Sequence, residues 1–165
     1  MREKKKDAVV IRPATAMDSV NLVRLIKAGY SETPAREIGK LDEQKLLEYV
    51  TTTLRHAFVI VADLQGRLLG SIGVAPIRTP WCETVVLAET WLAVTPAYRT
   101  TRVPEQLLDA LERFLDSNKL VGFLGSQMLT PAELNEVIAK RSSYLPSRHT
   151  FLRMPLPTLT KAASA

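Results

Sequence analysis

The side chains that most often act as nucleophiles or metal ligands are scarce in this sequence. One cysteine, Cys82, and two histidines, His56 and His149, are spread over its 165 residues, and there is no Gly-x-Ser-x-Gly motif. A single cysteine cannot form an internal disulfide or complete a zinc cluster, so we expect no metal site and a reducing compartment. We expect Cys82 to be a surface or partly buried residue, and His56 to end a helix, where the helix dipole favours positive charge. A nucleophilic triad is therefore not expected.

Basic residues gather at both ends of the chain. Residues 1–7 carry four bases and two acids, residues 137–165 carry five bases and no acid, and residues 8–136 have a net charge of −2. The lysines at 4–6 and the basic tail could contact phosphates, but aromatic residues make up only 6% and no base-reading motif is present. We therefore expect solvated basic ends, and nucleic-acid binding through them stays open only as a third hypothesis.

Length and composition favour one cytoplasmic domain. At roughly 150 residues per domain, a chain of 165 residues with 46% hydrophobic residues fits a single globular unit. No apolar run approaches the roughly 18 residues of a membrane span, and the apolar stretch 8–11 is too short for a signal peptide. We expect a basic arm at 1–7, a domain at 8–156, and a flexible tail at 157–165.

Hydrophobic patterns and capping residues divide the domain into strands and helices. We expect strands at 8–12, 58–62, 68–75, 85–94, 120–124 and 149–154. We expect helices after capping residues at Thr15 and Asp42, and at 104–116 and 131–141. Prolines at 13 and 76–80 are expected to end strands, and a Gly-containing turn at 63–67 predicts an antiparallel hairpin.

Two helices have a clear apolar side. In the helix after Asp42, this side holds Leu46, Leu47, Val50 and Leu54. In the helix 104–116, it is opposed by an acidic face that we expect to be solvated, formed by Glu105, Asp109, Glu112 and Asp116. An acidic face argues against membrane binding.

The order of elements predicts an α+β domain with layered α/β character. An antiparallel meander comes before a strand–helix–strand crossover, which gives a mixed central sheet with helices on both faces. Glycine is rare, with 7 residues in all and none between Gly73 and Gly122, in the stretch that contains the crossover helix.

This order, opened by Val-Ile-Arg-Pro-Ala-Thr at 10–15, resembles the GNAT superfamily of acetyl-CoA-dependent N-acetyltransferases. The most specific segment is Trp91-Leu-Ala-Val-Thr-Pro-Ala-Tyr-Arg99, which is followed by the helix that begins near Pro104. The resemblance covers about residues 8–155. It implies that acetyl-CoA is bound where the strand passes through a loop into the helix. Orphan amides and the positive end of the dipole make such a helix start an anion site.

The resemblance also implies which residues hold the coenzyme. The corresponding positions are Leu92, Val94, Arg99, Thr100, Thr101, Arg102, Val103 and Pro104. Arg102 and Pro104 stand where the family has glycines, and Pro104 removes one amide donor. The Arg102 guanidinium could bind phosphate in their place, or it could fill the space that the pyrophosphate needs.

For catalysis, the resemblance implies a base on the strand before the loop and a tyrosine acid on the last helix, although the helix expected at 131–141 contains no tyrosine. Glu89 is the only carboxylate deep in the stretch 85–94, and Tyr144 lies just beyond the helix expected at 131–141. Glu89 could instead point outward on an exposed face, because its alternation with Leu87 and Trp91 is ambiguous. Tyr144 could instead be an anchoring aromatic.

Two hypotheses about the function of the protein follow from the resemblance. The first is an enzyme that moves an acetyl group to a primary amine, of a small molecule or a protein, by direct attack. The second is a GNAT-fold protein that has lost catalysis and serves as a binding or structural part, for example in a phage virion. The missing loop glycines favour the second, and a homodimer or a partner protein is compatible with both.

Overall fold

The computed structural model describes residues 8–31, 36, 39–78, 80, 83–124, 137 and 141. Its strands and α-helices follow one another as β1 (Val10–Pro13), α1 (Ser19–Tyr30), α2 (Glu43–His56), β2 (Phe58–Leu64), β3 (Arg67–Arg78), β4 (Val85–Val94), α3 (Val103–Asn118) and β5 (Val121–Phe123). Short 3₁₀ segments at Ala16–Asp18 and Pro96–Tyr98 precede α1 and α3. The helix expected at 131–141 and the strand expected at 149–154 lie outside the described residues, apart from residues 137 and 141.

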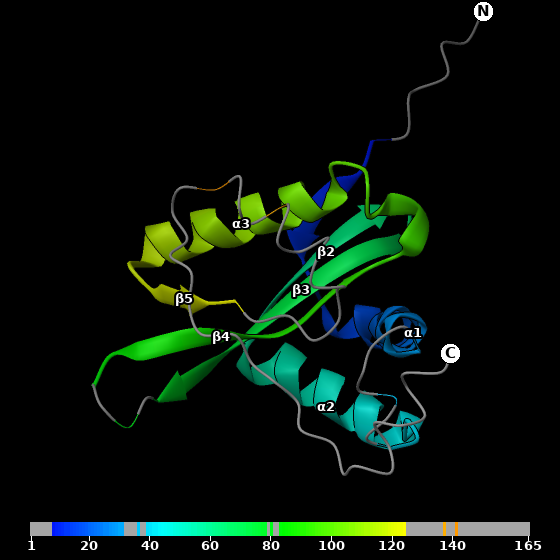
Figure 1. Cartoon of the computed structure of the whole chain (residues 1–165), viewed down its shortest axis with the longest axis horizontal. Helices are drawn as coiled ribbons and strands as arrows, with labels where there is room; N and C mark the ends of the chain where they lie inside the picture. The colour runs from blue at the N-terminus through cyan, green and yellow to red at the C-terminus, as the bar shows by residue number, and fades with distance from the viewer. Residues whose placement is uncertain are drawn as a thin grey trace, which may run out of the picture.

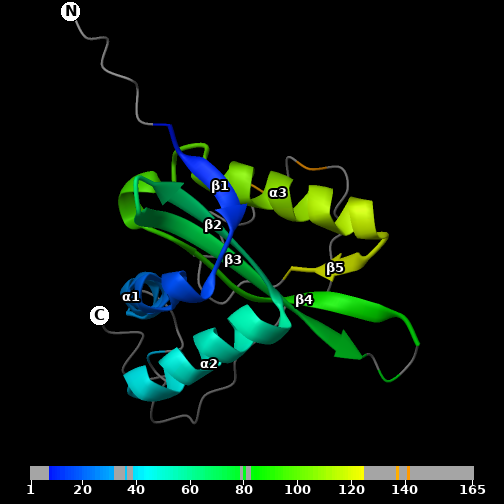
Figure 2. The same ribbon diagram turned by 180° about the vertical axis from the view of Figure 1, so that it is seen from behind.

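The five described strands form one mixed sheet in the order β1-β2-β3-β4-β5. Neighbouring strands from β1 to β4 are antiparallel, whereas β5 runs parallel to β4. Because adjacent parallel strands need a crossover, α3 passes over one face of the sheet to connect them (Figure 1). α1 and α2 lie on the opposite face, as the view from behind also shows (Figure 2). The predicted α+β architecture is confirmed.

Each face of the sheet has its own apolar core. On one face, α3 contributes Leu107, Leu108 and Leu111, which are fully buried. On the other face, Leu22 of α1 and Val50 of α2 are fully buried around Trp91. Burying a side chain of this size stabilises the fold by about 1.5–3 kcal/mol. No helix among the described residues has the length and apolar character needed to cross a membrane.

Of two prolines that we expected to end strands, one stands at a strand end and the other lies inside a strand. Pro13 is the last residue of β1 and pairs with Ile60 of β2. Pro76 lies within β3, beyond the last pair with β2, where β3 has a described partner on one side only. Proline has no N–H to donate and is tolerated where a strand lacks a second neighbour. The expected end of the first strand at Pro13 is therefore confirmed, and the expected end at Pro76 was wrong, because β3 continues to Arg78.

The hairpin and α2 follow from local chemistry. Gln65 and Gly66 form the two-residue turn between β2 and β3, and both have positive φ, at 54° and 85°. The Asp42 carboxylate caps α2 by accepting from the amides of Gln44 and Lys45, each at 3.1 Å.

The predicted apolar side of α2 was partly wrong. Val50 is buried and Leu46 and Leu54 are half-buried, but Leu47 is 40% exposed. Consecutive helical residues differ by about 100° around the axis, so Leu47 lies beside the stripe that Leu46 defines. Thr53 is buried in its place, and its hydroxyl donates to the carbonyl of Tyr49 at 2.8 Å.

A small charge cluster joins β1, β2 and the start of α1. The Arg12 guanidinium donates to both oxygens of Asp18, at 2.8 and 2.9 Å, and to Asp63 at 2.8 Å. Asp18 also accepts from the Thr15 amide at 2.7 Å, which is the carboxylate half of the predicted capping box. Hydrogen bonds from Arg12 lower the pKa of Asp18 to about 2, although burial of the carboxyl acts in the opposite direction.

The cluster predicts a loss of stability in acid. The pKa of Asp18 lies below its usual 3.8 only in the folded state, so its contribution is present above pH 3.8 and is lost as the pH falls towards 2. We expect the free energy of unfolding to lose about 2 kcal/mol over this window on account of Asp18. Urea unfolding at pH 5, 3 and 2 measures this loss. The free energy of unfolding should fall less with decreasing pH in Asp18→Asn than in the wild type. Asp116 is exposed, so Asp116→Asn is the control. If the free energy of unfolding falls as steeply with pH in Asp18→Asn as in Asp116→Asn, Asp18 is not the source of the loss.

Candidate functional site

A β-bulge lies in β4 at the predicted catalytic position. Trp91 pairs with Gly73 of β3, and Glu89 pairs with the next residue, Val74, so Thr90 is the extra residue. Strict alternation would place Leu87, Glu89 and Trp91 on one face. With the bulge, Leu87 packs in the core under α3, and Trp91 packs in the core under α1 and α2. The bulge therefore explains the ambiguous pattern in the sequence.

Gly73 makes room for the bulge. A Cβ atom at this position would lie 2.7 Å from the Thr90 hydroxyl oxygen and 2.8 Å from the Trp91 ring. Thr90 and Trp91 therefore approach the same face of β3, which is the arrangement expected where a residue is inserted. The Trp91 indole donates to the Ser71 hydroxyl at 3.2 Å, and Ser71 donates to the Ile60 carbonyl at 2.9 Å. These hydrogen bonds fix Trp91 in the core.

Glu89 lies where β4 and β5 stop pairing. The parallel ladder consists of the pairs Val86–Val121, Leu87–Gly122 and Ala88–Phe123. From Glu89 to Val94, β4 pairs only with β3 among the described residues. The Glu89 side chain is half-buried, and its Oε2 atom is inaccessible to solvent. The outward, exposed orientation that the sequence left open does not occur.

The loop after β4 is held by two side chains. The Arg99 Nε atom donates to the Val94 carbonyl at 3.1 Å, which links the loop to the end of β4. The Thr101 hydroxyl donates to the Tyr98 carbonyl at 2.6 Å and accepts from the Val103 amide at 3.3 Å. The loop thus uses a threonine and an arginine, rather than glycines, to turn into α3.

The predicted coenzyme-binding residues divide into an exposed and a buried group. Thr100, Thr101 and Arg102 are exposed, and Arg99 is half-buried. The side chains of Leu92, Val94, Val103 and Pro104 are buried, so only their backbone could face a ligand. The Val103 amide donates to the Thr101 hydroxyl oxygen, and Pro104 has no amide hydrogen. The loop therefore has fewer amides that could donate to a ligand. Arg102 is the N-cap of α3, and its side chain makes no capping hydrogen bond.

Gly70 is a residue of this region that sequence reasoning missed. A Cβ atom on Gly70 would lie 3.1–3.2 Å from side-chain atoms of Leu107 and Val103 and from the Ala93 carbonyl. The glycine therefore allows the first turns of α3 to pack closely on the sheet. An isolated glycine inside a strand pattern is the signal that could have indicated such a close approach.

The other sequence-predicted residues lie elsewhere. His56 ends α2 and is exposed, as expected for a helix-end residue. Cys82, Tyr144 and His149 lie outside the described residues. Within the described part of the chain, no group of three His, Cys, Asp or Glu side chains could hold a metal ion.

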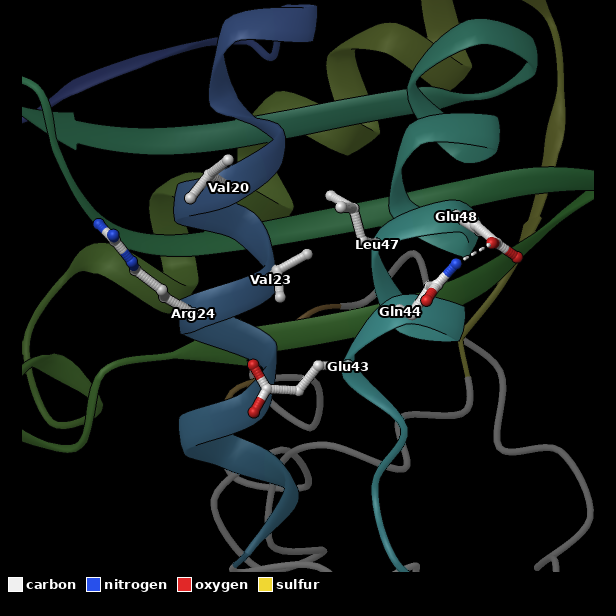
Figure 3. A pocket seen from close by; sticks show the side chains of 7 residues that line it. All are labelled: Val20, Val23, Arg24, Glu43, Gln44, Leu47 and Glu48. Atoms are coloured by element: carbon white, nitrogen blue, oxygen red, sulfur yellow. Dashed lines mark hydrogen bonds between the residues drawn. The ribbon is translucent and has the colours of Figure 1, made fainter.

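Two surface grooves do not include Glu89, although the second is lined in part by Thr95, which directly follows β4. One, of about 540 Å³, runs between α1 and α2 and includes Val20, Val23 and Leu47 (Figure 3). The exposed Leu47 faces this groove. The other, of about 380 Å³, lies between α1 and the β2–β3 turn and includes Arg24 and Arg67. Neither groove contains a residue from the predicted site.

Comparison with known proteins gives matches at the level of structure alone. No protein-family model and no curated protein matches the sequence. A predicted acetyltransferase from Clostridium acetobutylicum, solved with acetyl-CoA, has a TM-score of 0.68 at 17% identity, and the match covers 91% of this chain and 97% of that one. The ribosomal-protein-alanine N-acetyltransferase from Brucella melitensis biovar Abortus 2308 has a TM-score of 0.65 at 17% identity. The match covers 89% of this chain and 99% of that one.

A third structure extends the comparison. The aminoglycoside N-acetyltransferase AAC(6')-Iy in complex with CoA has a TM-score of 0.65 at 17% identity, covering 93% of this chain and 99% of that one. These matches give no support to the virion-associated alternative. At such low identity they establish the fold, and they confirm the resemblance first drawn from residues 91–99. The chain has the fold of the GNAT acetyltransferases.

Proposed function

We propose that this chain is an N-acetyltransferase that moves an acetyl group from acetyl-CoA to a primary amine by direct attack of the amine. The observation that carries the proposal is the position of Glu89. It follows the last β4 residue that pairs with β5, and one oxygen of its carboxylate, Oε2, is inaccessible to solvent at a bulge. Bulges are common next to active sites, where they re-aim a side chain.

The residues at the start of α3 are compatible with a phosphate group. Arg102 places an exposed guanidinium at the N-cap of α3, where the helix dipole also favours an anion. The Thr100 and Arg102 amides are the loop donors that would remain for phosphate oxygens. Arg99, through its hydrogen bond to the Val94 carbonyl, would hold the loop against β4. The similar structures solved with CoA and with acetyl-CoA support this ligand.

The chemistry divides between the ligand and the chain. When bound, acetyl-CoA supplies a thioester whose carbonyl carbon accepts the amine. In the chain, Glu89 would take the proton that the amine loses on attack, and Tyr144 would donate a proton to the departing thiolate sulfur. In each turnover Glu89 would gain one proton and Tyr144 would lose one. Glu89 would then release its proton to solvent and Tyr144 would take one up, which restores both residues. Similar structures named as aminoglycoside and ribosomal-protein acetyltransferases support an amine acceptor.

The direct test is binding of acetyl-CoA. We expect calorimetric heat on titration, and about 2.7 kcal/mol of added stability when acetyl-CoA exceeds its dissociation constant 100-fold. Because a hydrogen bond to a charged group contributes about 1.5–3 kcal/mol, Arg102→Ala should weaken binding about tenfold or more.

Two outcomes would change the conclusion. Tighter binding by Arg102→Ala would mean that Arg102 fills the phosphate space instead of binding the phosphate. No heat and no thermal shift for the wild type at millimolar acetyl-CoA would overturn the proposed function and favour a GNAT-fold protein without catalysis. Pantetheine, which lacks the phosphates, serves as the control ligand that should be insensitive to Arg102→Ala.

A further inference from the structure

The second surface groove contains two arginines that come from different elements. Asn21, Arg24, Leu25 and Ala28 of α1 line one side, and their spacing of i, i+3, i+4 and i+7 places them on one face of the helix. Arg67, the first residue of β3, lines the other side. This hollow of about 380 Å³ is called the arginine groove below.

The Arg24 side chain is directed away from the groove between α1 and α2. Figure 3 shows it extending away from α2 and its Leu47, although the residue also lines that groove. The Arg24 side chain is exposed, and its guanidinium donates to the Asn21 Oδ1 atom at 3.4 Å. This contact leaves the two N–H donors of the Asn21 amide nitrogen for a ligand in the arginine groove.

No described acidic side chain neutralises the arginines of the groove. Within the described part of the chain, Arg24 and Arg67 take part in no ion pair, and no aspartate or glutamate lines the groove. Asp63 accepts from the amide of Gly66, a residue of the groove, at 2.6 Å, but the same carboxylate is paired with Arg12 at 2.8 Å. The arginine groove therefore carries two positive charges without a described counter-charge.

Two arginines elsewhere in the fold are held differently. Arg12 is paired with two aspartates, and the Arg141 guanidinium contacts the Asp109 carboxylate at 2.6 Å and the Glu112 carboxylate at 2.7 Å. The acidic face of α3 that the sequence predicted to be solvated is therefore partly covered, although Asp116 is exposed. Arg12 and Arg141 stabilise the fold through carboxylates, a role that the contacts of the groove arginines do not support.

Two cations in one hollow favour an anionic ligand. A concave surface lined by charges of one sign raises the local concentration of the opposite charge, and an anion relieves the repulsion between the like charges. A guanidinium binds phosphate or carboxylate oxygens through two parallel N–H donors. The two guanidinium groups match the two negative charges of a phosphate monoester, whereas a carboxylate carries one.

We propose that the arginine groove is a binding site for a dianionic phosphate group, held by Arg24, Arg67 and the Asn21 amide. Leu25 of α1 and Leu68 of β3 also line the groove, and they provide an apolar surface for the carbon part of a phosphate ester. None of the residues assigned above to acetyl-CoA lines this groove. The phosphate site is therefore separate from the donor site, and it does not depend on the proposed acetyl transfer.

The test is calorimetric titration of the full chain with phenyl phosphate and with inorganic phosphate, at constant low ionic strength and about pH 7.5, where both are largely dianions. We expect both to bind. Arg24→Met and Arg67→Met should each weaken binding about tenfold, because each removes a charge-assisted hydrogen bond. Tighter binding of phenyl phosphate than of phosphate would assign the groove to phosphate esters, and equal binding would assign it to free phosphate.

The chain offers a matched control for each arginine. Arg113 of α3 and Arg78, at the far end of β3 from Arg67, are exposed and lie outside the groove. Arg113→Met and Arg78→Met should therefore leave the affinity for phenyl phosphate unchanged. Phenyl sulfate, a monoanion of similar shape, is the control ligand and should bind more weakly than phenyl phosphate.

The Arg102→Ala variant separates the arginine groove from the start of α3. It should bind phenyl phosphate as the wild type does, and Arg24→Met should bind acetyl-CoA as the wild type does. Loss of phenyl phosphate binding in Arg102→Ala alone, or weaker acetyl-CoA binding in Arg24→Met, would overturn the separate site. Equal losses in the groove variants and their controls, or no heat for the wild type at millimolar phenyl phosphate and phosphate, would also overturn it. If Arg67→Met does not fold, Arg24→Met decides the outcome.

Discussion

Glu89→Gln should lower kcat for acetyl transfer by about 100-fold or more, which is the usual contribution of a general base. The amide keeps the shape of the carboxylate but cannot take a proton from the amine. Glu89 is half-buried, with Oε2 out of solvent, so an isosteric neutral side chain should not reduce the free energy of unfolding. The measurement is the initial rate of free-thiol release from acetyl-CoA with a range of amines, together with urea unfolding of the same samples.

A carboxylate outside the bulge provides the control. Glu83 is exposed and lies just before β4, so Glu83→Gln should retain the wild-type rate. An equal loss of rate in both variants would point to a change in net charge and not to a base. A fall of less than about threefold in Glu89→Gln would remove Glu89 from the mechanism, because a general base contributes far more than this. The base would then have to be another group or a water molecule.

Much of the architecture was predictable because local patterns and global topology agree. The apolar runs and the Gly-containing turn at 58–75 specify a hairpin, and the apolar stripe of the helix at 104–116 specifies a crossover over one face. Both are confirmed, as is the cap at Asp42. The errors at Pro76 and Leu47 have a common cause. Each depends on whether a neighbouring element covers that position, and a local sequence pattern does not contain this information.

The site was less predictable because its geometry depends on pairing between distant residues. The sequence indicated Glu89 through a resemblance, but the bulge that orients it arises from the register of β4 against Gly73 and Val74. The close approaches occur at Gly70 and Gly73, within β3, and the loop after β4 contains no glycine. Arg141 was counted only as part of a basic tail. Its role as a partner of α3 depends on a contact across 32 residues.

Gly73→Val should reduce the free energy of unfolding by about 3 kcal/mol, at the upper end of the cost of overpacking a core. A Cβ atom alone would lie under 3 Å from both the Thr90 hydroxyl oxygen and the Trp91 ring. Trp91 is 1% exposed and hydrogen-bonded to Ser71, so the ring has little freedom to move away. Urea unfolding followed by circular dichroism measures the loss.

The same substitution tests whether the bulge serves catalysis. If Gly73 sets the path of β4 at Glu89, the folded fraction of Gly73→Val should transfer acetyl groups more slowly than the wild type, with binding of acetyl-CoA largely retained. Gly39→Val is the matched control, because nothing lies within 4 Å of a Cβ atom at Gly39. In combination with Trp91→Leu, the loss from Gly73→Val should be smaller than in the wild-type background, since the clashing ring is gone. A Gly73→Val protein as stable and active as the Gly39→Val control would show that β4 can hold Glu89 in place without the close contact at Gly73.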